Sequence, residues 1–254
     1  MLKKLLKYDM KANLFPLGLT YIILLGYGVF NRLLAVLVKS DYRAAFSFVF
    51  SSVGFFFAVL AAVVITIIFI ILRFYRNMMG NEGYLSHTLP VTPFQHMMSK
   101  TISGVLWLFI MSAVIYLSVW IWGGSIPSKI GFYFDFTGLI RSIIAGMEPV
   151  RAVTEAVNLL VSPLLLVVTF YFSICLGHLV PKMRVFGAIL FYIAIALVKA
   201  ALTTTLGIML IMMKLDYSTM TDVTLIMNLV VNVGCLFGFF WGSCLIMKHR
   251  LNLE

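Results

Sequence analysis

Three residues that could bind a ligand share one face of a predicted helix. Lys199 lies near the middle of an apolar run, and at helical spacing it aligns with Tyr192 and Thr203. In a membrane an isolated lysine costs at least about 2.5 kcal/mol, so its ammonium group should contact water, protein or a ligand. We therefore expect Tyr192, Lys199 and Thr203 to line a substrate path, with Lys199 binding an anionic or carbonyl group. A structural interpretation stays open, in which carbonyl or hydroxyl groups of neighbouring helices bind this ammonium group.

The remaining reactive residues do not form a recognisable catalytic or metal site. Cys175, Cys235 and Cys244 lie in apolar runs without the paired spacing of metal ligands, and His87 and His96 lack a third ligand nearby. The sequence also lacks the phosphate-binding, zinc-protease, serine-hydrolase and dinucleotide-binding motifs. We expect this chain to bind no metal or cofactor and to have no enzymatic activity of its own.

The composition indicates an integral membrane protein. Of the 254 residues, 62% are hydrophobic and only 11% are charged, and the mean hydropathy is +1.06. A membrane-crossing helix needs about 20 apolar residues, and uninterrupted runs of that length favour helices over the strands of a barrel. The sequence therefore predicts one all-α transmembrane domain over residues 1–254. Its six predicted spans run from Pro16 to Val38, Phe46 to Leu72, Thr101 to Trp122, Val157 to Gly177, Phe186 to Met212 and Val223 to Met247.

The basic residues predict how the chain is oriented in the membrane. The sequence has 19 Lys and Arg against 9 Asp and Glu, a net charge of +10. On so hydrophobic a chain this excess indicates membrane orientation rather than nucleic-acid binding. Eleven Lys and Arg flank the spans on the N-terminal side of the membrane and six flank them on the other side. The positive-inside rule then predicts a multi-pass protein of the cell (cytoplasmic) membrane with both termini in the cytoplasm.

The first 15 residues predict an amphipathic helix on the inner membrane surface. Leu2, Leu5 and Leu6 share one side of this helix, while four lysines gather on the other. Asp9 falls on the apolar side, and an ordinary basic flank to the first span is the alternative. The four lysines are Lys3, Lys4, Lys7 and Lys11.

The cytoplasmic loop of residues 73–100 contains its own structural unit. Gly80 can end the preceding helix. Thr92, Pro93 and Gln95 supply an N-cap, a first-turn proline and a capping-box partner for a helix that continues into the third span. We expect a structured elbow that is suited to docking another protein.

The same loop resembles that of a known transporter family. Its string FYRNMMGNEGYLSHTLPVTPFQHMMSK is similar to the inner loop of type-2 ATP-binding-cassette (ABC) permeases of Gram-positive bacteria, in which F-Y-x-N-x-x-G-x-E-G-Y-L-x-x-T-L-P-V precedes a Ser-Lys pair. Members of this family have six spans, and their loop holds a coupling helix that docks on an ATPase subunit. The resemblance assigns that ATPase-coupling role to Asn81, Glu82, Gly83, Tyr84, Leu85, Ser86, His87 and Thr88, with a second contact at Pro181, Lys182 and Arg184.

Two further features concern packing and the outer side. The large outer insertion is predicted between the third and fourth spans, at residues 123–156, whereas many family members have a re-entrant segment between the fifth and sixth. Gly234, Gly238 and Gly242 form a doubled GxxxG pattern, which predicts close helix packing within the chain or between two chains.

Taken with the resemblance, these features predict the permease subunit of an ABC exporter for peptides or amphipathic compounds. The implied partners are two ABC ATPase subunits, which carry ATP and Mg, a second permease chain, identical or homologous, and the lipid bilayer. The alternative is a membrane anchor or sensor without transport activity, which recruits a cytoplasmic partner through the same loop.

Overall fold

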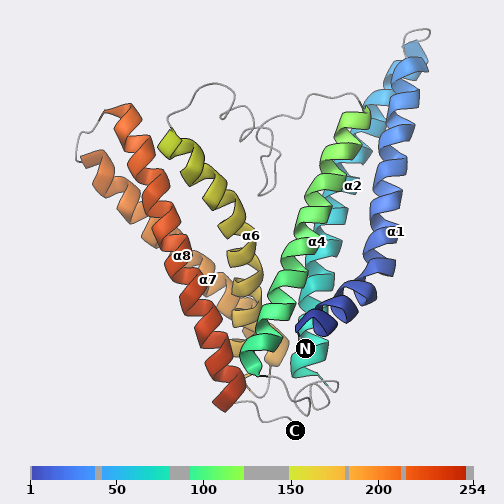
Figure 1. Ribbon diagram of the computed structural model, residues 1–254. Helices are drawn as coiled ribbons and strands as arrows, with labels where there is room; N and C mark the ends of the chain where they lie inside the picture. Colours follow the sequence, from blue (N-terminus) through green and yellow to red (C-terminus); the bar gives the residue numbers. More distant parts are fainter. Residues whose placement is uncertain are drawn as a thin grey trace. The chain divides into compact units, whose positions relative to one another are not determined.

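The computed structural model describes residues 2–37, 42–80, 92–122, 149–180, 183–212 and 216–249. Within these ranges the chain is helical and has no strand, and six helices are long and apolar enough to cross a membrane. The prediction of an all-α chain with six membrane-length helices is confirmed. These are α1 (Leu2–Leu37), α2 (Tyr42–Phe74), α4 (Pro93–Trp122), α6 (Pro149–Gly177), α7 (Arg184–Met212) and α8 (Tyr217–His249), with a π-helical turn η1 (Tyr75–Met79) directly after α2 (Figure 1).

The helices extend beyond the apolar windows that predicted them. The shortest have 29 residues and the longest has 36, so they measure roughly 44–54 Å against about 30 Å of hydrocarbon. Each residue added to an existing helix gains a backbone hydrogen bond, so the polar ends continue the helix. α6 begins at Pro149, a first-turn proline, and the last part of the predicted 123–156 insertion is therefore the start of α6. Residues 123–148 lie outside the described ranges.

The predicted interfacial helix is continuous with the first span. Residues 2–37 form the single helix α1, although Pro16 removes one of its backbone hydrogen bonds. Asp9, Asn13 and Leu17 lie on one side of α1, and all three are buried. The Asp9 carboxylate lies 3.8 Å from the Arg73 guanidinium of α2. This side of the helix start therefore packs on protein rather than on lipid.

The first of two compact units consists of α1, α2 through Arg73 and α4 from Ile102. Tyr21 of α1 connects the three helices, because its hydroxyl lies 3.1 Å from Thr66 Oγ1 of α2 and donates to the Trp107 carbonyl of α4 at 3.5 Å. Polar and apolar contacts thus hold these helices as one bundle. The neighbouring apolar cluster contains Leu24, Phe55, Val59 and Ala62.

The second unit contains the described residues of 74–101 together with α6, α7 and α8. α6 is its central helix, since it packs along both α7 and α8, which contact each other less. Phe172 of α6 stacks on Phe239 of α8 with ring centroids 5.1 Å apart, and Phe170 of α6 stacks on Tyr192 of α7 at 4.7 Å. Few residues in the most apolar parts of α7 and α8 are buried. In a membrane these faces contact lipid or another chain.

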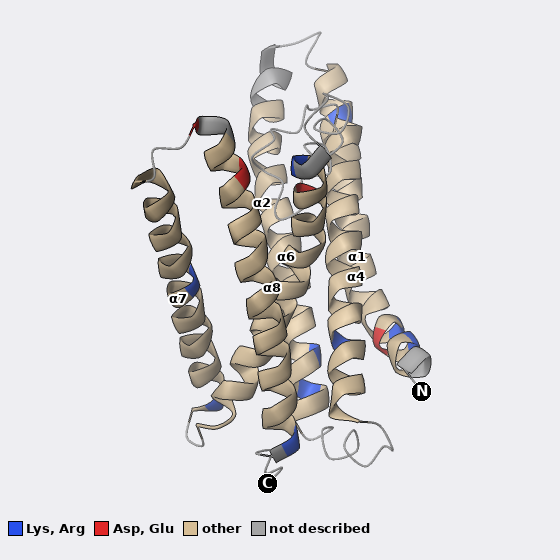
Figure 2. Cartoon of the chain, turned by 60° about the vertical axis from the view of Figure 1, so that its left-hand side comes forward, with Lys and Arg blue, Asp and Glu red and all other residues tan. Residues whose placement is uncertain are grey.

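Charged residues gather toward the helix ends, as Figure 2 shows. α7 departs from this pattern because it carries a basic position part-way along its length (Figure 2), and Lys199 is the basic residue inside this helix. A charge at this depth needs a local partner.

Candidate functional site

The predicted docking segment, Asn81 to Thr88, lies outside the described residues, as do Pro181 and Lys182 of the second predicted contact. The structure does describe the residues on both sides of each segment. The contacts of these flanking residues show which helices they pack against.

Tyr171 of α6 contacts both flanks of the docking segment. Its ring stacks on Phe74, at the end of α2, with centroids 3.9 Å apart and planes 11° apart. Its hydroxyl donates a hydrogen bond to the Lys100 carbonyl of α4 at 3.2 Å. Phe74 and Tyr171 are almost completely buried, with 0% and 2% of their surface exposed. One side chain of α6 therefore joins the chain entering residues 81–91 to the chain leaving them.

The residues before the predicted docking segment form the π-helical turn η1, which is wider than a turn of α-helix. Gly80 terminates it, as predicted, and the Gly80 N–H donates to the Tyr75 carbonyl at 2.9 Å. Met78 and Met79 are buried in the same turn. The ring of Tyr75 meets the His178 imidazole edge to face at 6.4 Å. Single π-helical turns frequently occur at functional sites, and this one connects α2 to the end of α6.

The residues after the predicted docking segment begin α4 with the cap and first-turn proline that the sequence predicted. Thr92 caps α4, because its Oγ1 accepts a hydrogen bond from the Gln95 N–H at 3.4 Å, and Pro93 is the first helical residue. Phe94 then packs edge to face on Phe240 of α8, with centroids 5.3 Å apart. The start of α4 is thus attached to α8 as well as to α6.

The turn between α6 and α7 leads to Arg184, the one described residue of the second predicted contact. Gly177, the last residue of α6, lies against the backbone of Ala188 in α7. Arg184, the described member of the second contact, begins α7 and is half-buried. Burial lowers the pKa of His178 below its ordinary value, and the positive charge of Arg184 lowers that pKa further. His178 is therefore neutral at pH 7, which suits an imidazole packed on an aromatic ring.

The predicted substrate path divides between two neighbours of α7. Tyr192 stacks on α6, whereas Thr203 lines a recess against α8 together with Thr224 and Asn228. Lys199 is half-buried, and it lies one turn before Thr203 on the same face of α7. The structure thus brings Lys199 and Thr203 to the α7–α8 side and places Tyr192 in the α6 packing.

The three glycines of α8 differ in their surroundings. A Cβ at Gly242 would lie 2.7 Å from the Phe172 ring of α6, so this glycine permits close packing. A Cβ at Gly234 or Gly238 would meet no atom within 4 Å among the described residues. Only the last glycine of the pattern therefore contributes to close packing in this part of the chain.

Comparison with known proteins adds no identification. No family model, curated protein or solved structure matches the chain. The likeness of residues 74–100 to ABC permeases therefore stays a prediction.

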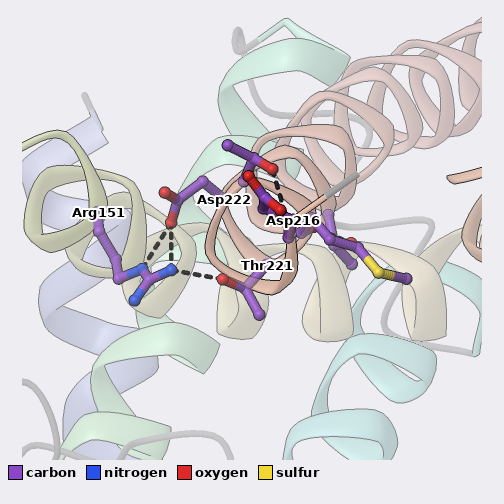
Figure 3. A network of polar contacts seen from close by, with 7 residues as sticks. Arg151, Asp216, Thr221 and Asp222 are labelled. Atoms are coloured by element: carbon purple, nitrogen blue, oxygen red, sulfur yellow. Dashed lines mark hydrogen bonds and ion pairs between the residues drawn. The ribbon is translucent and has the colours of Figure 1, made fainter. Parts of the chain in front are cut away.

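A charged network that the sequence analysis missed joins α6 to α8. The Arg151 guanidinium binds Asp222 Oδ1 through Nε and Nη2, each at 2.6 Å, and Nη2 also donates to Thr221 Oγ1 (Figure 3). Both charged side chains are about one-third exposed or less. The pair lies at the opposite end of α6 from Tyr171 and neutralises two charges near the helix ends.

Loss of this network should destabilise the α6–α8 contact modestly. Replacing Arg151 with Gln should lower the stability of the folded chain by about 1 kcal/mol, because Asp222 loses its charge-assisted hydrogen bonds. The double exchange Arg151→Asp with Asp222→Arg should recover part of that loss. Thermal unfolding of the detergent-purified chain measures both. Glu155→Gln, which removes a carboxylate one turn further along α6, is the matched control; equal melting of R151Q and wild type would contradict the expected role.

Proposed function

We propose that this chain is the membrane-spanning permease subunit of an ABC exporter, which couples ATP hydrolysis on a separate ATPase subunit to export of peptides or amphipathic compounds. The family resemblance of the 74–91 string supports the docking role. The packing of its flanks supports the coupling role. The chain itself supplies the path and the mechanical connection, and ATP and Mg bind to the partner ATPase.

The observation that carries this proposal is the attachment of both flanks of residues 81–91 to Tyr171. Because Phe74 and Lys100 contact the same buried side chain, a partner that displaces the docking segment also displaces α6. α6 packs along both α7 and α8, and close-packed helices transmit such displacements rather than absorb them. Closure of an ATPase pair could thereby change the arrangement of the helices that carry Lys199 and Thr203.

The proposed assembly has a defined set of partners. Two ATPase subunits dock in the cytoplasm, one on each of two permease chains, and the second chain is identical to this one or homologous to it. Residues 81–88 form the main contact, and Pro181, Lys182 and Arg184 form the smaller one. The basic start of α1 lies at the inner membrane surface, with both termini in the cytoplasm.

Co-purification from the native membrane tests this proposal. A tagged full-length chain, extracted in mild detergent, should bring down a soluble ATPase in a stoichiometric amount, identified by mass spectrometry, and the sample should hydrolyse ATP. Alanine at Glu82 or Tyr84 should reduce both the recovered ATPase and the hydrolysis. A chain that is intact and carries no ATPase, in preparations where control complexes survive, would favour the anchor or sensor function instead.

A further inference from the structure

A small recess lies between α7 and α8, the two helices of the second unit that contact each other least. The centre of a water molecule has about 10 Å³ of free space in it, which is room for about one water. Three polar side chains line this space, Thr203 from α7 and Thr224 and Asn228 from α8. The size of the recess and its polar lining therefore restrict its occupant to a very small polar species.

The two hydroxyl groups of the recess present acceptors rather than donors. Thr203 Oγ1 donates to the carbonyls of Lys199 and Ala200, at 3.1 and 3.0 Å. Thr224 Oγ1 donates to the Met220 carbonyl at 2.7 Å. A hydroxyl has one proton and two acceptor lone pairs, so each oxygen keeps lone pairs for a species that donates hydrogen bonds.

Asn228 supplies a hydrogen-bond donor beside these two acceptors. Its side-chain amide carries two N–H donors on nitrogen and two lone pairs on oxygen. The amide lies within a membrane-length helix, where polar groups need partners other than bulk water. Two acceptor oxygens and one amide donor thus surround a space of about one water.

A water molecule matches this set of groups. Its two protons suit the two hydroxyl oxygens, and its own oxygen suits an amide N–H. Three hydrogen bonds are also the usual number for a water inside a protein. We propose that one water molecule binds in the α7–α8 recess, where it donates to Thr203 Oγ1 and Thr224 Oγ1 and accepts from the Asn228 amide.

The charges near the recess favour water over a small cation. Three side-chain oxygens are ligands that a hard cation accepts, but such sites ordinarily include carboxylates. The described lining of the recess contains no acidic residue, and α7 contains none. Lys199 lies one turn before Thr203 on the same face of α7, about 6 Å along the helix axis, and its positive charge would repel a cation.

The proposed water connects α7 to α8 by hydrogen bonds. Thr203 belongs to one membrane-length helix, and Thr224 and Asn228 belong to the next. Polar bonds between such helices stabilise their association in a membrane. The site depends on these two helices alone and not on the proposed ATPase partner.

X-ray radiolytic footprinting of the full-length chain in nanodiscs tests the site. Brief irradiation turns water into hydroxyl radicals, which oxidise a neighbouring methionine to its sulfoxide, and mass spectrometry locates the product. Met227 of α8 lines the recess and is half-buried, so it reports on a water bound there. Met209 of α7 is the internal control, since it is 65% exposed and does not line the recess. We expect Met227 to be oxidised severalfold faster than Met209.

Variants that remove the partners of the water should protect Met227. Thr203→Val and Asn228→Leu should each lower the rate of Met227 oxidation severalfold and leave the rate at Met209 unchanged. The matched control is Thr205→Val, because Thr205 is exposed on the same helix, bonds to its own Leu202 carbonyl and does not line the recess.

Filling the recess tests the same site without removing a polar group. Gly207 lines the recess, and a Cβ there would meet no atom within 4 Å among the described residues. Gly207→Ala should therefore displace the water and lower Met227 oxidation severalfold in a chain that still folds. Gly234→Ala makes the same change at an open position of α8 that does not line the recess, and it should leave the rate unchanged.

Three results would overturn this site. The first is oxidation of Met227 no faster than that of Met209 in the wild-type chain. The second is an equal rate at Met227 in T203V, G207A and T205V, with all three eluting as folded chains. The third is a Met227 rate that changes when KCl replaces NaCl, which would indicate a bound cation instead of water.

Discussion

Tyr171→Ala should destabilise the second unit by about 3 kcal/mol or more, the usual cost of removing a buried aromatic ring. Tyr171 is 2% exposed, stacks on Phe74 and donates to the Lys100 carbonyl, so truncation removes two contacts and leaves a cavity. Tyr171→Phe keeps the stacked ring and loses only the hydroxyl, which should cost about 1 kcal/mol. Tyr116→Ala is the control on an exposed tyrosine of α4 and should change stability little.

Thermal unfolding of the full-length chain in detergent, followed by size-exclusion chromatography, ranks these variants. A double-mutant cycle with Phe74→Ala isolates the stacking contact, for which we expect a coupling of about 0.5–1.5 kcal/mol. Additive effects of the two substitutions, or equal melting of Y171A and Y116A, would show that Tyr171 does not join Phe74 to α6. A confirmed coupling would mean that the contact of Phe74 with Tyr171 links residues 81–91, the proposed docking site, to α6.

The six helices could be predicted because each depends on its own local sequence. Apolar runs of about 20 residues must be helical in a membrane, since no other single segment satisfies its backbone there. The start of α4 was equally local, because Thr92 and Pro93 supply a cap and a first turn within two positions. The helix ends were less predictable, since the start of α1 and the first residues of α6 are polar and still continue the helix.

The contacts between helices could not be derived in the same way. Arg151 and Asp222 are 71 positions apart, and no spacing rule connects two charges on different helices. Phe74 and Tyr171 are aromatic residues among many in apolar runs, so their stacking could not be derived from either run alone. Asn228 of α8 lines a recess with Thr203 of α7, and its place in an apolar run does not predict which helix it faces. Hydropathy records which side chains avoid water but not which neighbour they contact.

A single methyl group added at Gly177 should strongly destabilise the contact between α6 and α7. An alanine Cβ there would overlap the backbone N of Ala188 and lie 2.6 Å from its Cα, closer than such atoms approach in proteins. Backbone atoms cannot move aside as the end of a long side chain can, so α6 and α7 would have to separate. Gly187, on the other side of this crossing, has more room, because its Cβ would lie 3.4 Å from the Gly177 backbone.

Gly177→Ala should therefore cost about 2 kcal/mol or more, although alanine ordinarily stabilises a helix by about 0.5–1 kcal/mol relative to glycine. Gly187→Ala tests the same crossing with a tolerated methyl group, and Gly238→Ala tests an open position on α8; both should melt at or slightly above the wild-type temperature. Adding Ala188→Gly to Gly177→Ala should restore little, since the overlap involves backbone atoms that glycine keeps. Melting of G177A level with G187A would mean that α6 and α7 do not cross at Gly177. If G177A alone loses stability, α6 and α7 are held together at Gly177. This position lies shortly before the predicted contact at Pro181, Lys182 and Arg184 in the sequence.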